Sequence, residues 1–293
     1  MSTKKIDTET AVYGSKEQER RTGNVLVYIF LIAGALTMIL PLWWMFISSL
    51  KTPMQFLVQQ LDLRIPEKPQ WNNFVRIWTM KPLLNGILNS AFIAVTVVSV
   101  GTLTSSVAAF AFAKLKFPGK DRLFLALLGT MMIPFAIIMI PQFILYSRIG
   151  WLNTWYPLII PGLLGNVSMI FFLRQYMNGI PSSMIESARI DGASYPLIFW
   201  KIMLPNAKPA IAAQAILWFM GSWNDYFAPS IYINDEKRMP IQVMIQSLNA
   251  YYAIQTDYPA ILAASVVALL PVLIVFIIFQ KQIIASVAMT GLK

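Results

Sequence analysis

Residues 258–279 read YPAILAASVVALLPVLIVFIIF, a stretch of the chain without a single charged side chain. An α-helix rises about 1.5 Å per residue, so about 20 apolar residues cross a hydrocarbon core of roughly 30 Å. This stretch meets both the length and the polarity requirement. It therefore predicts a transmembrane helix.

Five further stretches are similarly long and predominantly apolar. Of the 293 residues, 57% are hydrophobic and only 12% are charged, whereas soluble domains carry roughly 25% charged residues. We therefore expect an all-α membrane protein with six transmembrane helices. In chain order they cover Val25 to Leu50, Asn85 to Ala113, Arg122 to Ser147, Trp155 to Asn178, Ala210 to Pro229 and Tyr258 to Phe279. Prolines inside these stretches predict kinks, which neighbouring helices make tolerable in lipid, at Pro41, Pro134, Pro141, Pro161 and Pro271.

The chain divides into a short tail and one membrane domain. Residues 1–24 are mostly polar and charged, so we expect a disordered tail. The first apolar stretch runs past 20 residues without a small-residue cleavage site, which favours a retained helix over a signal peptide. The membrane domain then spans 25–293 and contains two longer connections, at 180–207 and 230–257.

The distribution of charge predicts the topology. The tail, the 114–122 loop, the 174–208 segment and the C-terminus together carry a net charge of +8, and the connections on the other side carry +2. The positive-inside rule therefore places both termini, and the 180–207 connection, in the cytoplasm, with 230–257 outside. Topology explains the basic composition, and we expect no nucleic-acid partner.

The residue inventory excludes many functions. The chain has neither Cys nor His, which removes thiol nucleophiles, disulfides, and imidazole bases and metal ligands. A membrane enzyme would then need paired carboxylates or a Ser-Lys arrangement, and the acidic residues form no such motif. A secondary transporter would need charges within its spans, and these are nearly absent. The only Gly-Lys pair, Gly119-Lys120, is followed by Asp121, so no phosphate-binding loop is present.

Most polar residues within the spans are uncharged. Because such residues commonly hydrogen-bond between membrane helices, we expect most of them to join helices and a minority to face a substrate path. They are Asn89, Ser90, Thr96, Ser105, Ser106, Asn166, Ser168 and Gln214.

The connection at 180–207 has an unusual local pattern. Pro181 and a capping box formed by Ser183 and Glu186 predict a short helix that ends at Gly192. Ser194 is suited to cap a second helix, and Pro205 is poorly suited to continue it. We thus expect a helix, a sharp corner and another helix, with Ile190, Phe199 and Trp200 as apolar docking area. Without a partner, the same residues would suit an amphipathic linker on the lipid headgroups.

The spacing within this connection resembles the cytoplasmic loop of ABC importer permeases, in which Glu-Ala-Ala, three residues, Gly, nine residues, Ile, one residue and Leu-Pro recur. The positions in register are Glu186, Ala188, Gly192, Ile202, Leu204 and Pro205, and Ser187 stands where the pattern has its first Ala. The resemblance implies a coupling helix between spans four and five that docks on a separate ATPase subunit. It also implies a bacterial cytoplasmic membrane, a second permease subunit, two ATP-binding subunits that use ATP and Mg, and an extracellular solute-binding protein. This chain itself would bind no cofactor.

A narrower resemblance is to the second permease subunit of maltose-type importers. It rests on Ile-Asp-Gly-Ala at 190–193, on the run from Trp223 to Phe227 followed by Pro229, and on the ending at 289–293. It implies a sugar or oligosaccharide as the solute; a permease for polyamines, metals or peptides is the alternative, and the particular solute is left open. The residues expected along the substrate path or against the binding protein are Trp223, Asn224, Asp225, Asn249, Tyr251 and Tyr252.

Overall fold

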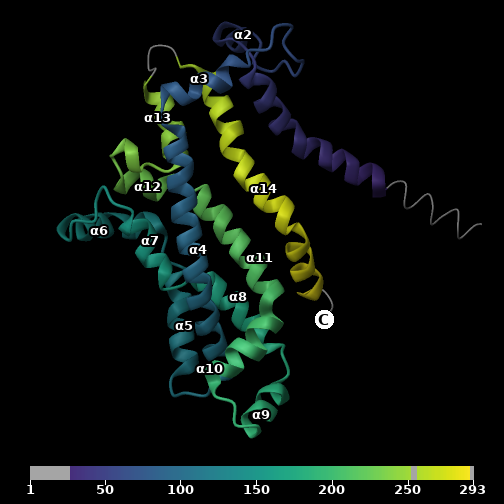
Figure 1. Ribbon diagram of the computed structural model, residues 1–293, viewed down its shortest axis with the longest axis vertical. Coiled ribbons are helices and arrows are strands. Elements are labelled where there is room, and N and C mark those ends of the chain that lie inside the picture. Colours follow the sequence, from purple (N-terminus) through teal and green to yellow (C-terminus); the bar gives the residue numbers. More distant parts are fainter. Residues whose placement is uncertain (1–26, 252–255, 291–293) are drawn as a thin grey trace, which may run out of the picture.

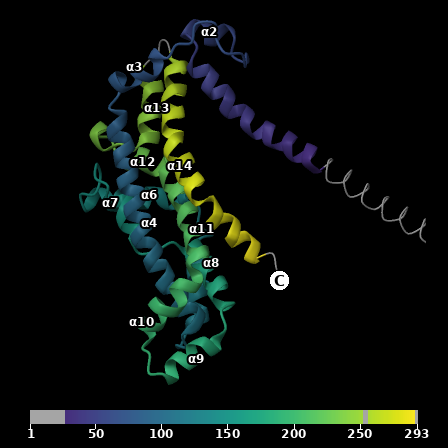
Figure 2. The same cartoon turned by 45° about the vertical axis from the view of Figure 1, so that its right-hand side comes forward.

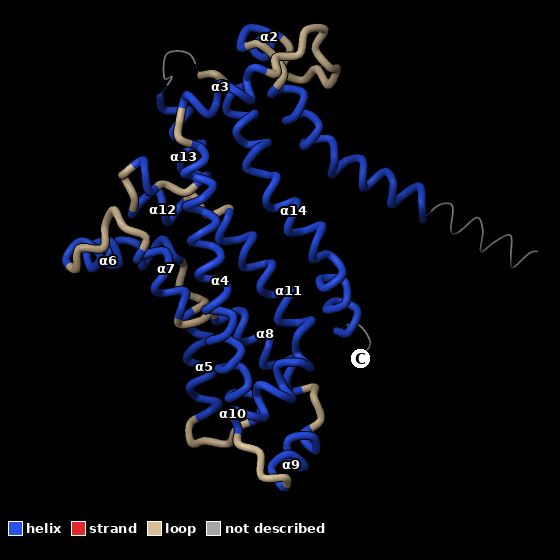
Figure 3. Tube along the Cα trace, in the orientation of Figure 1, coloured by secondary structure: helices blue, strands red, loops and turns tan. Residues whose placement is uncertain are grey.

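The computed structural model describes residues 27–251 and 256–290, and every regular element within them is helical (Figures 1 and 3). The expected all-α architecture is thus confirmed for this part of the chain, and the tail 1–24 lies outside the described residues. The first helix spans Val27–Ser49. It is followed by α2 (Pro53–Val58), α3 (Asn72–Met80), α4 (Leu83–Lys114), α5 (Lys120–Thr130), α6 (Phe135–Arg148), α7 (Tyr156–Leu163), α8 (Val167–Asn178), α9 (Ser182–Ile190), α10 (Tyr195–Ile198), the π-helical turn η1 (Phe199–Met203), α11 (Leu204–Trp223), α12 (Phe227–Tyr232), the 3-10 turn η2 (Glu236–Arg238), α13 (Ile241–Tyr251) and α14 (Tyr258–Thr290).

Four stretches of helix are long and apolar enough to cross a membrane. They are Val27–Ser49, Leu83–Lys114, Tyr156–Asn178 and Tyr258–Gln282, and the bent pair α5 and α6 makes a fifth if it is one span. In place of the expected span from Ala210 to Pro229, the structure has most of α11 and part of α12. Helix α11 has 20 residues and is long enough to cross a membrane. It is not apolar enough to be included among these stretches, because its first turns contain Asn206 and Lys208. By length and composition, the described residues thus give four or five spans.

The expected kink at Pro134 is a complete break. Helices α5 and α6 meet at an angle of 91°, so the stretch from Arg122 to Ser147 is two helices where one span was expected. Pro134 lies at the start of α6 in an extended conformation, with ψ at 139°. Proline has no N–H to donate and disfavours a helical conformation in the residue before it, which here is Ile133. Pro141, Pro161 and Pro271 lie inside helices.

Helix α4 is the central element of the bundle and packs against α7, α8, α11 and α13 (Figures 1 and 2). Close approach at its middle depends on Gly101. A β-carbon there would collide with the ring of Trp218 in α11 and with the carbonyl oxygen of Gly162 in α7. Gly162 in turn leaves room for Val97 of α4, whose side chain would lie 2.6 Å from a β-carbon at position 162. Small residues therefore set the distance between these helices.

Some of the neutral polar residues expected to join helices do so. The Ser105 hydroxyl of α4 accepts a hydrogen bond of 2.9 Å from the backbone N–H of Asn166, and the Asn166 side chain caps α8 by accepting from the N–H of Met169. The neighbouring Thr104 hydroxyl donates to the carbonyl of Leu163 at 2.9 Å. These bonds satisfy backbone groups at the break between α7 and α8, which would otherwise be unpaired in the membrane.

The apolar interior forms two main clusters. One joins α3, α4, α11, α13 and α14 and includes Ile77, Trp223 and Met244. The other joins α4, α8, α9, η1 and α11 and includes Phe110 and Met203. Helix Val27–Ser49 takes little part in either cluster, because it diverges from the bundle with most of its apolar side chains exposed (Figures 1 and 2).

Candidate functional site

Two features of the fold stand out as functional candidates. The first is the corner formed by α9, α10 and the residues between them, which projects from one end of the bundle (Figure 1). The second is a cavity of about 840 Å³ between α4, α7 and η2.

The corner forms where the sequence predicts it. Gly192 adopts a φ of +83°, a left-handed conformation that suits glycine. The N–H of Ala193 donates to the carbonyl of Ala188 and the N–H of Gly192 donates to the carbonyl of Arg189, so the last carbonyls of α9 are paired as in a Schellman ending. The Arg189 guanidinium also donates to the carbonyl of Ala193 and lies over the ring of Tyr195, 4.7 Å from its centre. Arg189 thus fastens the two sides of the corner.

Two details of the predicted corner are wrong. The capping box is absent, because α9 begins at Ser182 behind Pro181, which puts Ser183 inside the first turn, and no side chain caps the helix. Pro205 does not end the second helix either. Instead α10 passes through the π-helical turn η1 into α11, with Pro205 in the first turn of α11. A π-helical turn shifts the backbone pairing by one residue, which lets a continuous helix accommodate a residue without an N–H.

The signature residues are mostly exposed. Glu186, Ser187, Gly192 and Pro205 are exposed, and Ala188, Ile202 and Leu204 are partly buried. Of the expected docking residues, Ile190 and Trp200 are exposed, by 86% and 52%. Phe199 is buried against Phe110 of α4, with ring centres 5.6 Å apart, so it serves the core and not a docking surface.

The corner is joined firmly to the bundle. Ile185, Ile198 and Phe199 belong to the same buried cluster as Phe110 of α4. The Lys114 ammonium at the end of α4 donates to the carbonyl of Ile180 at 2.6 Å, directly before α9. A force on α9 would therefore reach α4 through both apolar and polar contacts.

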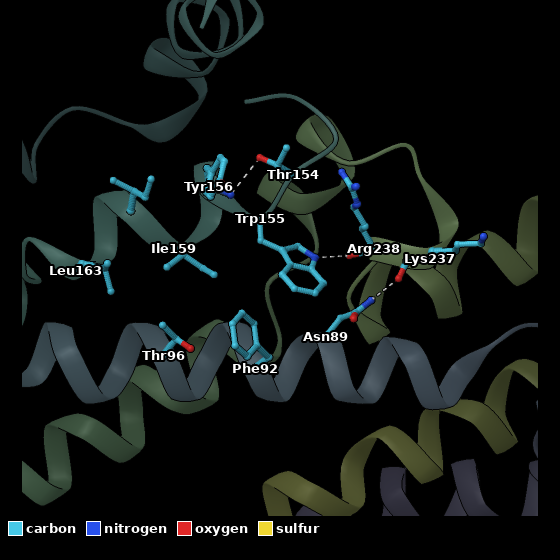
Figure 4. Close-up of a pocket in the computed structure, with 11 residues that line it drawn as sticks. Asn89, Phe92, Thr96, Thr154, Trp155, Tyr156, Ile159, Leu163, Lys237 and Arg238 are labelled. Atoms are coloured by element: carbon cyan, nitrogen blue, oxygen red, sulfur yellow. Dashed lines mark hydrogen bonds between the residues drawn. The ribbon is translucent and has the colours of Figure 1, made fainter. Parts of the chain in front are cut away.

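The cavity lies near the opposite end of α4. Asn89, Phe92 and Thr96 extend from α4 toward Trp155 and other residues on and before α7, as Figure 4 shows. The remaining lining residues are Thr154, Tyr156, Ile159, Ile160, Leu163, Lys237 and Arg238. The lining is thus aromatic, aliphatic and amide- or hydroxyl-bearing, with two cationic residues and no carboxylate.

Hydrogen bonds hold two of the lining side chains in place. The Trp155 indole N–H donates to the carbonyl of Arg238 at 3.0 Å, and its ring lies 5.2 Å from that of Phe92 (Figure 4). The Asn89 amide donates to the carbonyls of Lys237 and Met239, each at 3.0 Å. These three bonds join the cavity wall to η2 and to Met239 directly after it. Flat rings with a fixed orientation beside amide and hydroxyl groups suit a ligand with apolar faces and hydroxyl edges.

The residues expected along the substrate path or against the binding protein do not line this cavity. Trp223 is a core residue, 1% exposed, whose indole N–H donates to the carbonyl of Ala268 in α14. Asn224 is exposed and accepts from the side chain of Gln242. Asp225 is partly buried, accepts from the N–H of Ala228, and lines a separate cavity of about 140 Å³. Asn249 is exposed on α13 and accepts from the hydroxyl of Thr256.

Two expected residues fall outside this description. The side chain of Tyr251 and the whole of Tyr252 lie outside the described residues. The connection at 230–257 that contains them is not a simple loop, because it includes η2 and α13.

Three residues that line the cavity, Phe92, Trp155 and Tyr156, were not predicted from the sequence. The only available signal was the polar and aromatic run Thr154-Trp155-Tyr156 at the start of an apolar stretch.

Comparisons with known proteins agree with this architecture. Residues 101–288 match the family described as the binding-protein-dependent transport system inner membrane component. The arabinooligosaccharides transport system permease protein of Halalkalibacterium halodurans is 31% identical, over 94% of this chain and 99% of that protein. The diacetylchitobiose uptake system permease protein of Streptomyces coelicolor is 31% identical, over 89% of this chain and 86% of that protein.

A solved structure extends the similarity to the fold. One chain in the crystal structure of a bacterial ABC transporter involved in the import of the acidic polysaccharide alginate has a TM-score of 0.75 and 25% identity, covering 89% of this chain and 96% of that one. The match takes in most of the described helices. This chain therefore belongs to the family of inner-membrane permease components of binding-protein-dependent ABC transport systems.

Proposed function

We propose that this chain is one of two permease subunits of a carbohydrate importer in the bacterial cytoplasmic membrane. The observation that carries the proposal is the exposed corner at Gly192, which presents the spacing from Glu186 to Pro205 at one end of the bundle. The names of the two relatives, which concern oligosaccharides, support a carbohydrate as the solute.

The importer we propose contains four membrane-associated chains and a binding protein. A second permease of similar fold completes the translocation path, two ATP-binding subunits use ATP and Mg, and an extracellular solute-binding protein delivers the sugar. This chain contributes no phosphate-binding loop, so the energy comes from the ATP-binding subunits. Six spans follow if α5 with α6 and α11 each cross the membrane. Both termini are then on the cytoplasmic side, the side to which the charge distribution also assigns α9.

A displacement of α9 can reach the cavity at the other end of α4 by the following route. Closure of the ATP-binding subunits displaces α9, and the Lys114 to Ile180 hydrogen bond with the buried cluster around Phe199 transfers this displacement to α4. Asn89 lies 25 residues before Lys114, about 37 Å along a helix with a rise of 1.5 Å. Movement of α4 therefore alters the wall of the 840 Å³ cavity, which we propose is part of the sugar path.

The outer side receives the solute in this proposal. The connection at 230–257, with Asn249, Tyr251 and Tyr252, contacts the binding protein, and Asn224 and Asp225 lie near the outer end of α11. Amide, hydroxyl and aromatic groups satisfy a carbohydrate without burying a charge in the membrane. The cavity lining supplies such groups at Asn89, Thr96, Phe92 and Trp155, with the cationic Lys237 and Arg238 beside them.

A permease for polyamines, metals or peptides is the second candidate. A cationic solute calls for buried carboxylates, and the cavity lining has none. Among the described residues, no three acidic side chains gather as a metal-binding group would require. Uptake assays on a strain lacking the gene separate the candidates. We expect sugar uptake to fall with polyamine and metal uptake intact, and the reverse pattern would contradict the proposal.

A further inference from the structure

The loop between α4 and α5 forms a second, basic pocket. It has a volume of about 510 Å³ and is lined by residues 115–117 and 119–122. Three of its lining residues are cationic, namely Lys116, Lys120 and Arg122, and one, Asp121, is acidic. The pocket is distinct from the cavity beside Trp155 and from the α9 corner.

The charges of this pocket are not balanced within the described residues. Asp121 forms an ion pair with Arg174 of α8 at 3.3 Å, so another cation already neutralises the only lining carboxylate. Lys120 donates to the backbone carbonyl of Leu115. In the part of the chain that the structure describes, the side chains of Lys116 and Arg122 have no hydrogen-bond or ion-pair partner. A concave site with unpaired cations is suited to an anion.

The position of the pocket indicates which anion it meets. It lies between the end of one membrane-crossing helix, Leu83–Lys114, and the start of the apolar bent pair that begins at Lys120. The loop is therefore at the level of the lipid headgroups. Leu125 lies one helical turn beyond Arg122 on α5 and is 65% exposed, and Leu123 is 55% exposed. The cations of the pocket are complementary to the headgroup of an anionic lipid, and the exposed leucines are complementary to its hydrocarbon chains.

We infer that Lys116, Lys120 and Arg122 bind the phosphate of an anionic phospholipid, with its acyl chains along α5. An acidic segment of a soluble protein would engage the cations but would leave the neighbouring leucines without an apolar partner. The inference rests on the membrane location of the chain and adds a lipid site to the proposed permease. It is independent of the identity of the transported solute.

Native mass spectrometry of the full-length chain tests this site. The purified chain is equilibrated in detergent with equal amounts of phosphatidylglycerol and phosphatidylcholine, and the ratio of retained lipids is measured. We expect the wild type to prefer phosphatidylglycerol and Lys116→Gln with Arg122→Gln to reduce the preference by about tenfold or more, given the contribution of each basic residue near an anionic lipid.

A matched control removes two charges from the same end of the molecule. Lys201→Gln with Lys208→Gln changes exposed residues outside the pocket, and we expect the lipid preference to stay within about twofold of the wild type, because no pocket contact changes. Equal losses in both double variants would show a general charge effect and would overturn the site.

Two other outcomes would contradict the lipid assignment. Retention of inorganic phosphate without preference for phosphatidylglycerol would identify a free-phosphate site and contradict the lipid assignment. An unchanged lipid ratio with weaker binding of the ATP-binding subunit would assign the loop to a protein contact and would also contradict it. The measurement uses neither sugar nor ATP, so its failure would leave the proposed transport function standing. A thermal unfolding profile like that of the wild type confirms that each variant is folded.

Discussion

The Lys114 ammonium donates a hydrogen bond of 2.6 Å to the carbonyl oxygen of Ile180, which joins the last residue of α4 to the residue just before Pro181, the N-cap of α9. A second contact, of 3.4 Å, runs from the same ammonium to the carbonyl of Asn178 at the end of α8. One cation thus satisfies carbonyls at a helix terminus and ties the projecting corner to the central helix.

Replacing Lys114 should weaken this connection. In Lys114→Met the carbonyls lose a charged donor, which we expect to cost about 1.5 to 3 kcal/mol of stability. We also expect ATP hydrolysis stimulated by the loaded binding protein to fall more than basal hydrolysis. Lys114→Arg keeps a charged donor and should recover part of the stimulation. Equal stimulation in Lys114→Met and the wild type would contradict transmission through this residue.

A substitution at Gly192 tests the corner. Gly192→Val introduces a β-carbon at a φ of +83°, which costs roughly 1 to 2 kcal/mol. Nothing lies within 4 Å of that β-carbon, so the effect is conformational and not steric crowding. We expect assembly with the ATP-binding subunits, or their coupling to transport, to fall, and Glu186→Lys to act similarly by reversing a charge on α9. Normal transport by both variants would refute the coupling assignment.

A substitution at Gly101 tests the packing of the central helix. The β-carbon of Gly101→Ala would collide with backbone at Gly162, which cannot move as a side-chain tip can. Overpacking of this kind costs about 1 to 3 kcal/mol or more, so we expect a lower unfolding temperature in detergent. Gly221→Ala is the matched control, because a β-carbon there meets nothing within 4 Å. A Gly101→Ala variant as stable as the control would show that the helices separate easily.

Substitutions of two tryptophans distinguish a role in the cavity from a role in the core. Trp155→Ala removes an aromatic wall of the cavity, and we expect lower sugar uptake with the complex still assembled. Trp223→Ala empties a buried site and should cost about 3 to 5 kcal/mol of stability. Uptake by the Trp155 variant at the wild-type rate would exclude the cavity from the sugar path.

Labelling of single cysteines tests the orientation. The chain has no native Cys, so each introduced thiol is unique. With an impermeant reagent added outside intact cells, Asn249→Cys should react and Ser187→Cys should not, because the charge distribution places α9 inside. Both residues are exposed in the structure, so accessibility within the fold is comparable. The reverse pattern would invert the proposed topology.

The sequence alone predicted the features of this protein that depend on residues close together in the chain. Apolar length predicted the four helices that are long and apolar enough to cross a membrane, and Gly192 predicted the left-handed corner, because both depend on residues close in the chain. The signature spacing from Glu186 to Pro205 likewise identified the family before any contact was known. Motifs of this kind need no information about distant segments.

Only the tertiary structure decided which residues that are far apart in the sequence contact one another. The sequence places Trp223 among the residues expected along the substrate path or against the binding protein, whereas packing of α11 on α14 buries it and pairs its indole with Ala268. Trp155 lines the cavity because the chain brings α4, α7 and η2 together, and Phe92 and Arg238 contact it from 63 and 83 residues away. Polar and apolar side chains in a membrane protein have several suitable environments, and only the packing of distant helices selects among them.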